Sequence, residues 1–407
     1  MKRIFILPWL ILTIAIASCT SDTGLKIPES PTSGTTQAIT TKSLEKCLTA
    51  AEKWYAQMDS INGTRSGSMK RDIESIQYLS TPSITRSNVT DTVLYLVNYS
   101  NNAGFALLGA TQNSEDIYAI SADGKLQIED TTFNKGLQMF IQSAENHATA
   151  MATSGLVDVS YIYGIKRSCG VDFPESVAKW NQTAPYNKYC PTVNGKQGYV
   201  GCGALAAGML MAYYKHPTSI NGRALNWSNI VDNNNTDDIA RFLEDLAGAN
   251  FLNSQYLSST SLERTTYTYS FKTTFTKCFY NMDECWNFYP FENNRVSIFD
   301  FIQKGISAWE KPTPILMFGN CISNDNYVGH FWIVDGFIER IRFIGNSDIT
   351  SEADPMLHIL WGWGGNGNGY YLYLLSDHHL NQSLYNGNYT SYPFGSLSVF
   401  GKIYPTK

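Results

Sequence analysis

The chain has few charged residues and no cluster of basic ones. Charged side chains make up 16% of its 407 residues, and 30 Lys and Arg against 35 Asp and Glu give a net charge of −5. Proteins that bind nucleic acid carry a basic patch as their electrostatic footprint. We therefore expect no nucleic-acid partner.

The chain also lacks the cysteine spacing of a zinc site. None of the 8 cysteines is separated from the next by two residues, which is the usual pairing of zinc ligands. No metal and no other cofactor is expected. In an exported protein Cys278 and Cys285 are a plausible disulfide pair, and the sequence leaves the other pairings open.

No long apolar run opens the chain, although a short one does. Lys2 and Arg3 precede an apolar segment, residues 4–16, which is too short to span a bilayer stably and is typical of a signal peptide. Ile16-Ala17-Ser18-Cys19 resembles a bacterial lipobox, in which the cysteine becomes the lipidated first residue. An ordinary secretory peptide with an incidental cysteine is the alternative.

These features predict the first two segments. Residues 1–18 are expected to be a lipoprotein signal peptide, and residues 19–42, rich in Ser, Thr, Pro and Gly, a flexible stalk. Acyl chains on Cys19 would hold the protein at the bacterial cell envelope, with the outer membrane as the expected site. Release after maturation stays open.

The length favours two folded domains. Residues 43–167 predict a small α+β unit, with helices at 43–58 and 136–150 and strands at 91–100, 105–109 and 117–120. Its only histidine, His147, has no obvious polar partner and is expected on a solvated helix face. Residues 168–407 form the second expected domain.

The second domain is organised around Cys202. Gly201 precedes it, and a helix of small residues follows, which Pro217 must end. Residues 204, 207, 208 and 211 form one apolar stripe, so this helix is expected to be central and buried. At a helix N-terminus the nucleophilic thiolate form of Cys202 is favoured. A buried structural cysteine is the alternative.

Five histidines follow Cys202, and one is a suitable base. His216 lies about 21 Å along the same helix, and His378 and His379 lie in a polar loop. His358 is expected on a strand face. His330 begins an apolar strand that should end in a turn at 335–336, and Gly329 before it would leave space for a substrate backbone.

Two further segments complete a candidate site. Gln182, 20 residues before Cys202, has an amide that can stabilise an oxyanion, together with the Cys202 backbone N–H. Trp361 and Trp363 lie in a glycine-rich stretch that reads as a shaped loop leading into a strand. The alternatives are that Gln182 is a turn residue with no chemical role, and that the glycine-rich stretch is only a turn between two strands whose tryptophans belong to the core.

Together these motifs resemble the streptopain-like family of bacterial cysteine peptidases, in the papain-like clan. The resemblance rests on the Asn181–Asn187 segment, on Gly329-His330 with Val334-Asp335-Gly336, and on Trp361-Gly362-Trp363-Gly364-Gly365. Residues 94–99 and 102–105 resemble the family's inhibitory prodomain. Leu360 stands where the family commonly has Asn, and Phe331 replaces a small residue.

The resemblance implies an α+β fold: a papain-like catalytic domain, with a central helix packed on an antiparallel sheet, after a small α+β prodomain. It implies a zymogen whose own prodomain is an intramolecular inhibitor and whose substrates are proteins or peptides, cut two residues after an apolar side chain. Cleavage at Lys166-Arg167 would separate the two domains.

Roles for single residues follow from the same resemblance. Cys202 is the expected nucleophile and His330 the base, Gln182 is the oxyanion donor, and Trp361 shelters and orients His330. The substrate groove is expected to include Gly201, Gly329, Trp363 and Gly364. A Cys–His acyltransferase and a catalytically decayed surface-binding protein on the same scaffold are the alternatives.

Overall fold

The computed structural model describes a little over seven-tenths of the chain: residues 41–61, 71–80, 92–128, 134–153, 161–282, 285–288, 296–308, 312–323, 326–344, 350–373, 396–400 and 403–406. The expected signal peptide, Cys19, His378 and His379 lie outside these residues. Within them, no helix has the length and apolarity needed to cross a membrane.

The N-terminal unit has the predicted helices and strands. It consists of α1 (Leu44–Ile61), β1 (Ile73–Ser80), β2 (Thr92–Tyr99), a short 3-10 turn η1 (Ser100–Asn102), β3 (Phe105–Gly109), β4 (Ile117–Ser121) and α2 (Lys135–Thr153). Cys47, Ala51 and Trp54 on the inner face of α1 are buried, as its periodicity predicts. β1 is an exposed edge strand that the sequence did not reveal.

The expected stalk ends two residues earlier than predicted. Lys42 is buried, and its ammonium group donates to the Ser114 carbonyl at 2.8 Å and to the Asp116 carboxylate at 2.9 Å. Its backbone N–H donates to the Ala110 carbonyl. Lys42 therefore belongs to the folded N-terminal unit, because these partners outweigh the cost of burying its charge.

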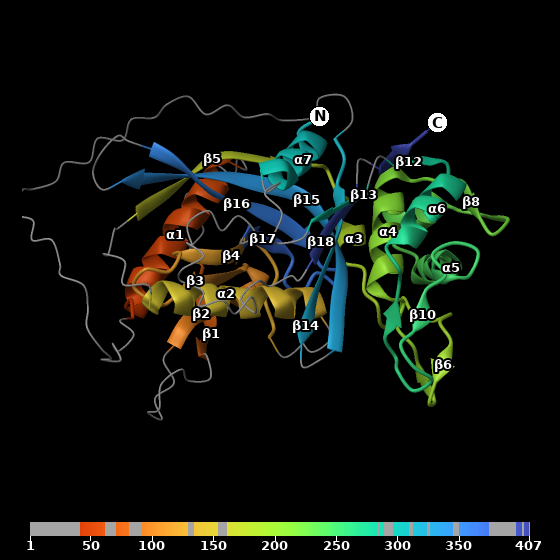
Figure 1. The fold of residues 1–407 in the computed structure, drawn as a ribbon, viewed down its shortest axis with the longest axis horizontal. Helices are drawn as coiled ribbons and strands as arrows, with labels where there is room; N and C mark the ends of the chain where they lie inside the picture. Colours follow the sequence, from red (N-terminus) through yellow and green to blue (C-terminus); the bar gives the residue numbers. More distant parts are fainter. Residues whose placement is uncertain are drawn as a thin grey trace, which may run out of the picture.

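One antiparallel sheet runs through both parts of the chain (Figure 1). Its strand order in the described residues is β1-β2-β3-β4-β17-β16-β15-β14-β18-β13. The strands of the second part are β13 (Cys285–Phe288), β14 (Ile315–Ser323), β15 (Asn326–Ile344), β16 (Thr350–Leu360), β17 (Gly369–Leu372) and β18 (Ser396–Phe400). The two parts join where β4 pairs with β17, at Ile120–Tyr370 and Ala119–Tyr371.

The strand that carries His330 is longer than predicted. The expected turn at 335–336 is wrong, because β15 continues to Ile344. A register shift between Val334 and Gly336 marks a bulge at Asp335, where one residue is left over in the pairing with β16. The Asp-Gly pair therefore bends a strand here instead of ending it.

The expected domain boundary at 167/168 falls inside a strand. β5 (Tyr161–Gly170) pairs with the second half of β15, from Gly336 to Ile344. Lys166 and Arg167 lie in the middle of this pairing, and the carboxylate of Glu339 on β15 accepts from the Arg167 guanidinium. The segment that joins the two parts is thus a structural member of the shared sheet.

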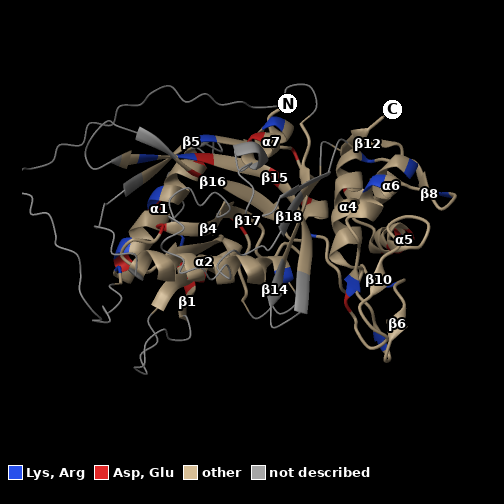
Figure 2. Ribbon diagram, in the orientation of Figure 1, with Lys and Arg blue, Asp and Glu red and all other residues tan. Residues whose placement is uncertain are grey.

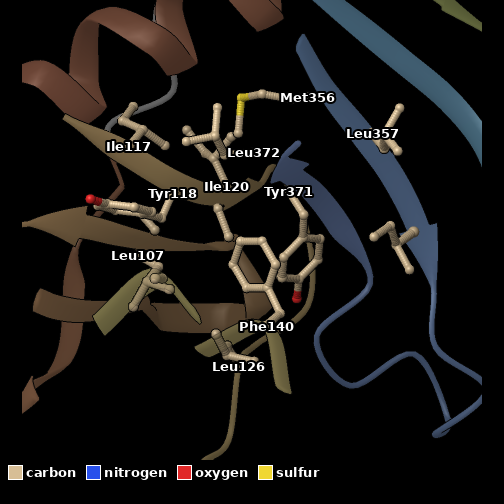
Figure 3. Close-up of a cluster of buried hydrophobic side chains, with 14 of the residues drawn as sticks. Leu107, Ile117, Tyr118, Ile120, Leu126, Phe140, Met356, Leu357, Tyr371 and Leu372 are labelled. Carbon is tan, nitrogen blue, oxygen red and sulfur yellow. The ribbon is translucent and has the colours of Figure 1, made fainter. Parts of the chain in front are cut away.

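Two hydrophobic cores lie on opposite faces of the sheet. One combines residues of the N-terminal unit, such as Phe140 of α2, with Tyr371 of β17, and the two rings meet edge to face at 4.8 Å. Figure 3 shows part of this cluster, with the Phe140 and Tyr371 rings side by side and Ile120 close to Leu372. A single apolar core therefore holds the N-terminal unit against the sheet.

The second core lies between the sheet and a group of helices (Figure 1, green). These are α3 (Glu175–Ala178), α4 (Cys202–Tyr214), the π-helix η3 (Ser228–Asp232), α5 (Thr236–Ala247) and α6 (Tyr269–Lys277), while α7 (Val296–Ile306) packs on the other face. Short paired strands complete the fold: β6 (Thr192–Val193), β7 (Lys196–Gln197), β8 (Ser219–Ile220), β9 (Arg223–Ala224), β10 (Gln255–Tyr256), β11 (Arg264–Thr265), β12 (Tyr280–Met282) and β19 (Ile403–Pro405). Lys and Arg are interspersed with Asp and Glu over both parts (Figure 2).

Candidate active site

Cys202 is the first residue of α4. The backbone of Gly201 before it has φ +90°, which other residues rarely adopt, and a Cβ there would lie 3.0 Å from the Arg264 carbonyl oxygen. The helix is buried on all sides from Gly203 to Ala212, and not only along the predicted stripe. The reason is that α4 lies between β15 and α5, where a Cβ on Gly208 would meet Leu243 at 2.6 Å.

β15 brings His330 beside this cysteine. The backbone N–H of Phe331, the next residue, points at the Cys202 sulfur and stabilises its charged form. His330 is buried, and its Nε2 lies 3.0 Å from the Trp361 carbonyl oxygen. Between these two described side chains no hydrogen bond is present. The candidate nucleophile and the candidate base are neighbours that are not joined by a hydrogen bond.

The pKa shifts of Cys202 and His330 agree with the absence of a hydrogen bond between their side chains. Burial raises the pKa of Cys202 to about 11, although the backbone N–H groups of Phe331, Gly203 and Cys202 itself act in the opposite direction. Burial lowers the pKa of His330 to about 4, against the stabilising Trp361 carbonyl. The predicted thiolate is therefore disfavoured in this state, because desolvation exceeds the opposing effect of the backbone N–H groups.

The glycine-rich loop carries Trp361 to His330. Trp361 is buried, its ring centre lies 6.2 Å from that of His330, and it also contacts Trp332 and Tyr371. Its backbone N–H donates to Oδ1 of Asn368 at 3.0 Å. Trp361 thus lies beside His330, as the resemblance implies.

Gln182 lies on the other side of the loop. Its carbonyl accepts from the backbone N–H of Val200, two residues before Cys202, and its side chain is buried. The preceding Asn181 forms a β-bridge with Trp363, and Gly364 N–H donates to the Trp180 carbonyl at 3.0 Å. These bonds bring the Gln182 segment, α4 and the tryptophan loop together.

The four expected groove residues lie around these three elements, but not all face open space. Gly364 is exposed, and the Trp363 ring meets Tyr199 edge to face at 6.4 Å. The space beside Gly329 is filled, since a Cβ there would lie 2.7 Å from the Phe318 ring. A substrate backbone would need Phe318 to move before it could pass there.

The N-terminal unit covers the site. A Cβ on Gly136, in the first turn of α2, would lie 2.7 Å from Cδ2 of His330 and 2.6 Å from Cζ3 of Trp361. Only a glycine fits here without displacing one of the two rings. The backbone of α2 therefore lies directly against the residues expected to act in catalysis.

Comparison with known proteins identifies the second part of the chain. Residues 180–371, from Trp180 beside Gln182 to Tyr371 behind Trp361, match the Peptidase C10 family. This segment of the chain is thus similar to the cysteine peptidase domains of the C10 family. None of the curated proteins matches the chain.

Two solved structures from Prevotella intermedia are similar to it. A mutant fragment of prointerpain A has 16% sequence identity and a TM-score of 0.49, and the match covers 80% of this chain and 98% of that one. Active interpain A cysteine protease has 17% identity and a TM-score of 0.37, with 57% and 94% covered.

The remaining histidines of the C10 domain have structural partners. His216 lies just beyond the end of α4, and its Nε2 is 2.9 Å from the carbonyl oxygen of Cys278. His358 lies on a strand face, as predicted, and its Nδ1 is 2.5 Å from Asp335 Oδ1. In the N-terminal unit, the expectation of a solvated His147 is wrong, because its Nδ1 contacts the Tyr118 hydroxyl at 2.7 Å.

Cysteine pairing also differs from expectation. Cys47, Cys190, Cys202 and Cys278 have free thiols, so Cys278 does not form the plausible disulfide with Cys285. Among the described residues, no group of His, Cys, Asp or Glu side chains is arranged to hold a metal ion.

Sequence reasoning missed two residues at this site. Gly136 was taken only as the start of a helix, and no local pattern marks a glycine that a distant ring approaches. Asn368 lies in the glycine-rich stretch, and nothing in the sequence distinguishes it from Asn366. The Nδ2 of Asn368 donates to the Ala178 carbonyl at 2.9 Å while its Oδ1 holds Trp361.

Proposed function

We propose that the chain is an endopeptidase made as a zymogen, with Cys202 as nucleophile and His330 as general base. One observation carries the proposal: within a cysteine peptidase domain, helix α2 of the chain itself lies against His330 and Trp361. The N-terminal unit then acts as an intramolecular inhibitor, and protein or peptide chains are the substrates.

The chemistry needs His330 to turn toward the sulfur. His330 takes the Cys202 proton, and the thiolate attacks the peptide carbonyl carbon to form a tetrahedral oxyanion. Gln182 and the Cys202 backbone N–H donate to that oxyanion, a contribution of about 3–4 kcal/mol for one donor in a measured case. The C–N bond breaks as the imidazolium protonates the leaving amine, which leaves a thioester on Cys202.

Water completes the cycle. His330 accepts a proton from water as its oxygen attacks the thioester carbonyl, and the new tetrahedral intermediate expels the Cys202 sulfur. The products are a carboxylic acid and the restored Cys–His pair. With α2 in place the first proton transfer is disfavoured, since burial raises the pKa of Cys202 and lowers that of His330, and no hydrogen bond joins the base to the sulfur.

The test uses the chain without residues 1–19, alongside Cys202→Ala and His330→Ala. Either substitution should reduce casein hydrolysis on the order of 10⁶-fold and leave the N-terminal unit attached. Release of new N-termini without an added amine separates hydrolysis from acyl transfer. If Cys202→Ala changes neither casein cleavage nor processing, the peptidase proposal is wrong and a binding role on this scaffold replaces it.

We further propose that the protein is exported and anchored by lipid on Cys19 at the cell envelope. The support is the basic start, the short apolar segment and the small residues before Cys19. Growth with an alkyne-labelled fatty acid should label the full chain but not a Cys19→Ser variant. Equal labelling of both would contradict the anchor.

A further inference from the structure

His330 has no side chain to fix its orientation. Leu360, where the family commonly has Asn, is buried and apolar, and it cannot accept a hydrogen bond. The partner of the ring is instead the Trp361 backbone carbonyl, 3.0 Å from Nε2. A carbonyl only accepts, so the proton of neutral His330 is on Nε2 and Nδ1 is left to take the thiol proton.

The position of this carbonyl depends on the loop that carries it. The Trp361 peptide lies at the start of a stretch in which Gly362, Gly364, Gly365 and Gly367 all have positive φ. A glycine-rich backbone can adopt many conformations, so contacts with other residues must hold it in one of them. The side chain of Asn368 supplies one, since its Oδ1 accepts from the Trp361 N–H at 3.0 Å.

The other end of the same amide reaches across the site. Nδ2 of Asn368 donates to the carbonyl of Ala178, the last residue of α3, at 2.9 Å. Two residues later Trp180 accepts from Gly364 N–H, and Gln182 follows. One half-buried side chain thus connects the His330 side of the site to the segment that carries the oxyanion donor.

We propose that Asn368 is the positioning residue of this peptidase: through Trp361 it fixes the tautomer and orientation of His330, and through Ala178 it sets the place of the Gln182 segment. The inference rests on the proposed roles of Cys202 and His330. The chemistry requires an amide, because one end must accept from an N–H group and the other must donate to a carbonyl. A carboxylate keeps the first bond and repels the Ala178 carbonyl.

The loop offers a matched control two residues earlier. Asn366 is also half-buried, but its Oδ1 accepts from the Gln127 N–H of the N-terminal unit at 3.2 Å. Because Gln127 leaves with the N-terminal unit on processing, Asn366→Ala in the processed enzyme truncates an asparagine of the same loop without touching Trp361 or Ala178.

The experiment compares wild type, Asn368→Ala, Asn368→Asp and Asn366→Ala, each processed to the active form, with the unprocessed Cys202→Ala chain as the inactive reference. We expect Asn368→Ala to lower kcat by about 10- to 100-fold, because a small misplacement of a catalytic group has a cost of that size, with a smaller change in KM. The pH profile of Cys202 alkylation by iodoacetamide should shift to higher pH. Asn368→Asp should be intermediate, and Asn366→Ala should resemble wild type.

Thermal unfolding of each variant separates positioning from folding. An Asn368→Ala enzyme whose kcat and alkylation profile match wild type overturns the inference. The inference is also overturned if Asn366→Ala loses as much kcat as Asn368→Ala while the two variants lose the same amount of Tm. Activity remaining in Cys202→Ala would instead overturn the proposed function, which makes the two failures distinguishable.

Discussion

At the scale of single residues, two histidines on neighbouring strands show how burial and partners set opposite charge states. His330 has only a carbonyl partner, and burial lowers its pKa to about 4. Burial acts on His358 in the same direction, but the Asp335 carboxylate outweighs it and raises the pKa, with Asp123 adding to the effect. The bulge at Asp335 makes this pair, because it places a residue of β15 beside His358 of β16.

The Asp335–His358 pair should stabilise the fold most at low pH. A histidine whose pKa is raised in the folded state contributes stability below its unfolded value of about 6.5, and that stability is lost as pH rises through the folded pKa. Asp335→Asn should therefore lower the free energy of unfolding by about 2 kcal/mol at pH 6 and by less at pH 9. Urea unfolding in the Cys202→Ala background measures both values, and an equal loss at the two pH values contradicts the ion pair.

At the scale of elements, the first turn of α2 is where inhibition can be altered by one methyl group. Alanine at position 136 in a free helix would stabilise it by about 0.5–1 kcal/mol relative to glycine. Here the added Cβ meets both rings at under 3 Å, and overpacking of this kind costs about 1–3 kcal/mol. Gly136→Ala should therefore loosen the N-terminal unit and shorten the lag before processing several-fold.

The matched control for that prediction is Gln138→Ala, which changes an exposed residue one half-turn later in the same helix. It should leave the lag unchanged. A Gly136→Ala chain that is processed at the wild-type rate would show that α2 does not hold the site closed.

The other element that matters for processing is β5. Lys166 and Arg167 are partly exposed, but their backbone pairs with β15 and Glu339 contacts both side chains. Because a protease needs an extended, unpaired segment, cleavage after Arg167 should be slow and limited by local opening. Glu339→Gln should speed trypsin cleavage there in a Cys202→Ala chain, while Glu52→Gln on exposed α1 should not. Equal rates by mass spectrometry would contradict the role of Glu339.

At the scale of the whole molecule, two histidines held neutral lie at the contact between the N-terminal unit and the peptidase domain. Burial lowers the pKa of His147, against the nearby Glu115 and Asp354, while Glu115 forms an ion pair with buried Arg340 of β15 at 3.0 Å. Burial would raise the pKa of Glu115, but Arg340 brings it below its usual value. The contact between the N-terminal unit and the peptidase domain should therefore be more stable at neutral pH than in acid.

Acid should weaken this contact. A histidine whose pKa is lowered in the folded state is stabilising above its unfolded value of about 6.5 and loses that contribution as pH falls toward the folded pKa, which is about 4 for His330. Full-length Cys202→Ala protein should lose unfolding free energy between pH 6.5 and 4. His147→Gln should flatten that dependence, and His216→Gln, at the far end of α4, should leave it unchanged. A flat profile in the parent protein contradicts the prediction.

The sequence alone determined the features that depend on local chemistry. The helix beginning at Cys202, α1, α2, α5 and strands β2 to β4 follow from periodicity, glycine and proline, because near neighbours set those preferences. The motifs around Gln182, His330 and Trp361 were sufficient to indicate a peptidase of this family, since each keeps its chemical pattern within a short segment.

Tertiary structure decided what depends on distant contacts. The single sheet shared by both parts, the place of β5 within it, and the approach of Gly136 to His330 join segments far apart in the chain, which no local pattern encodes. The neutral state of Cys202 was decided there as well. Desolvation by surrounding elements, and not the helix N-terminus alone, sets the pKa of a buried thiol.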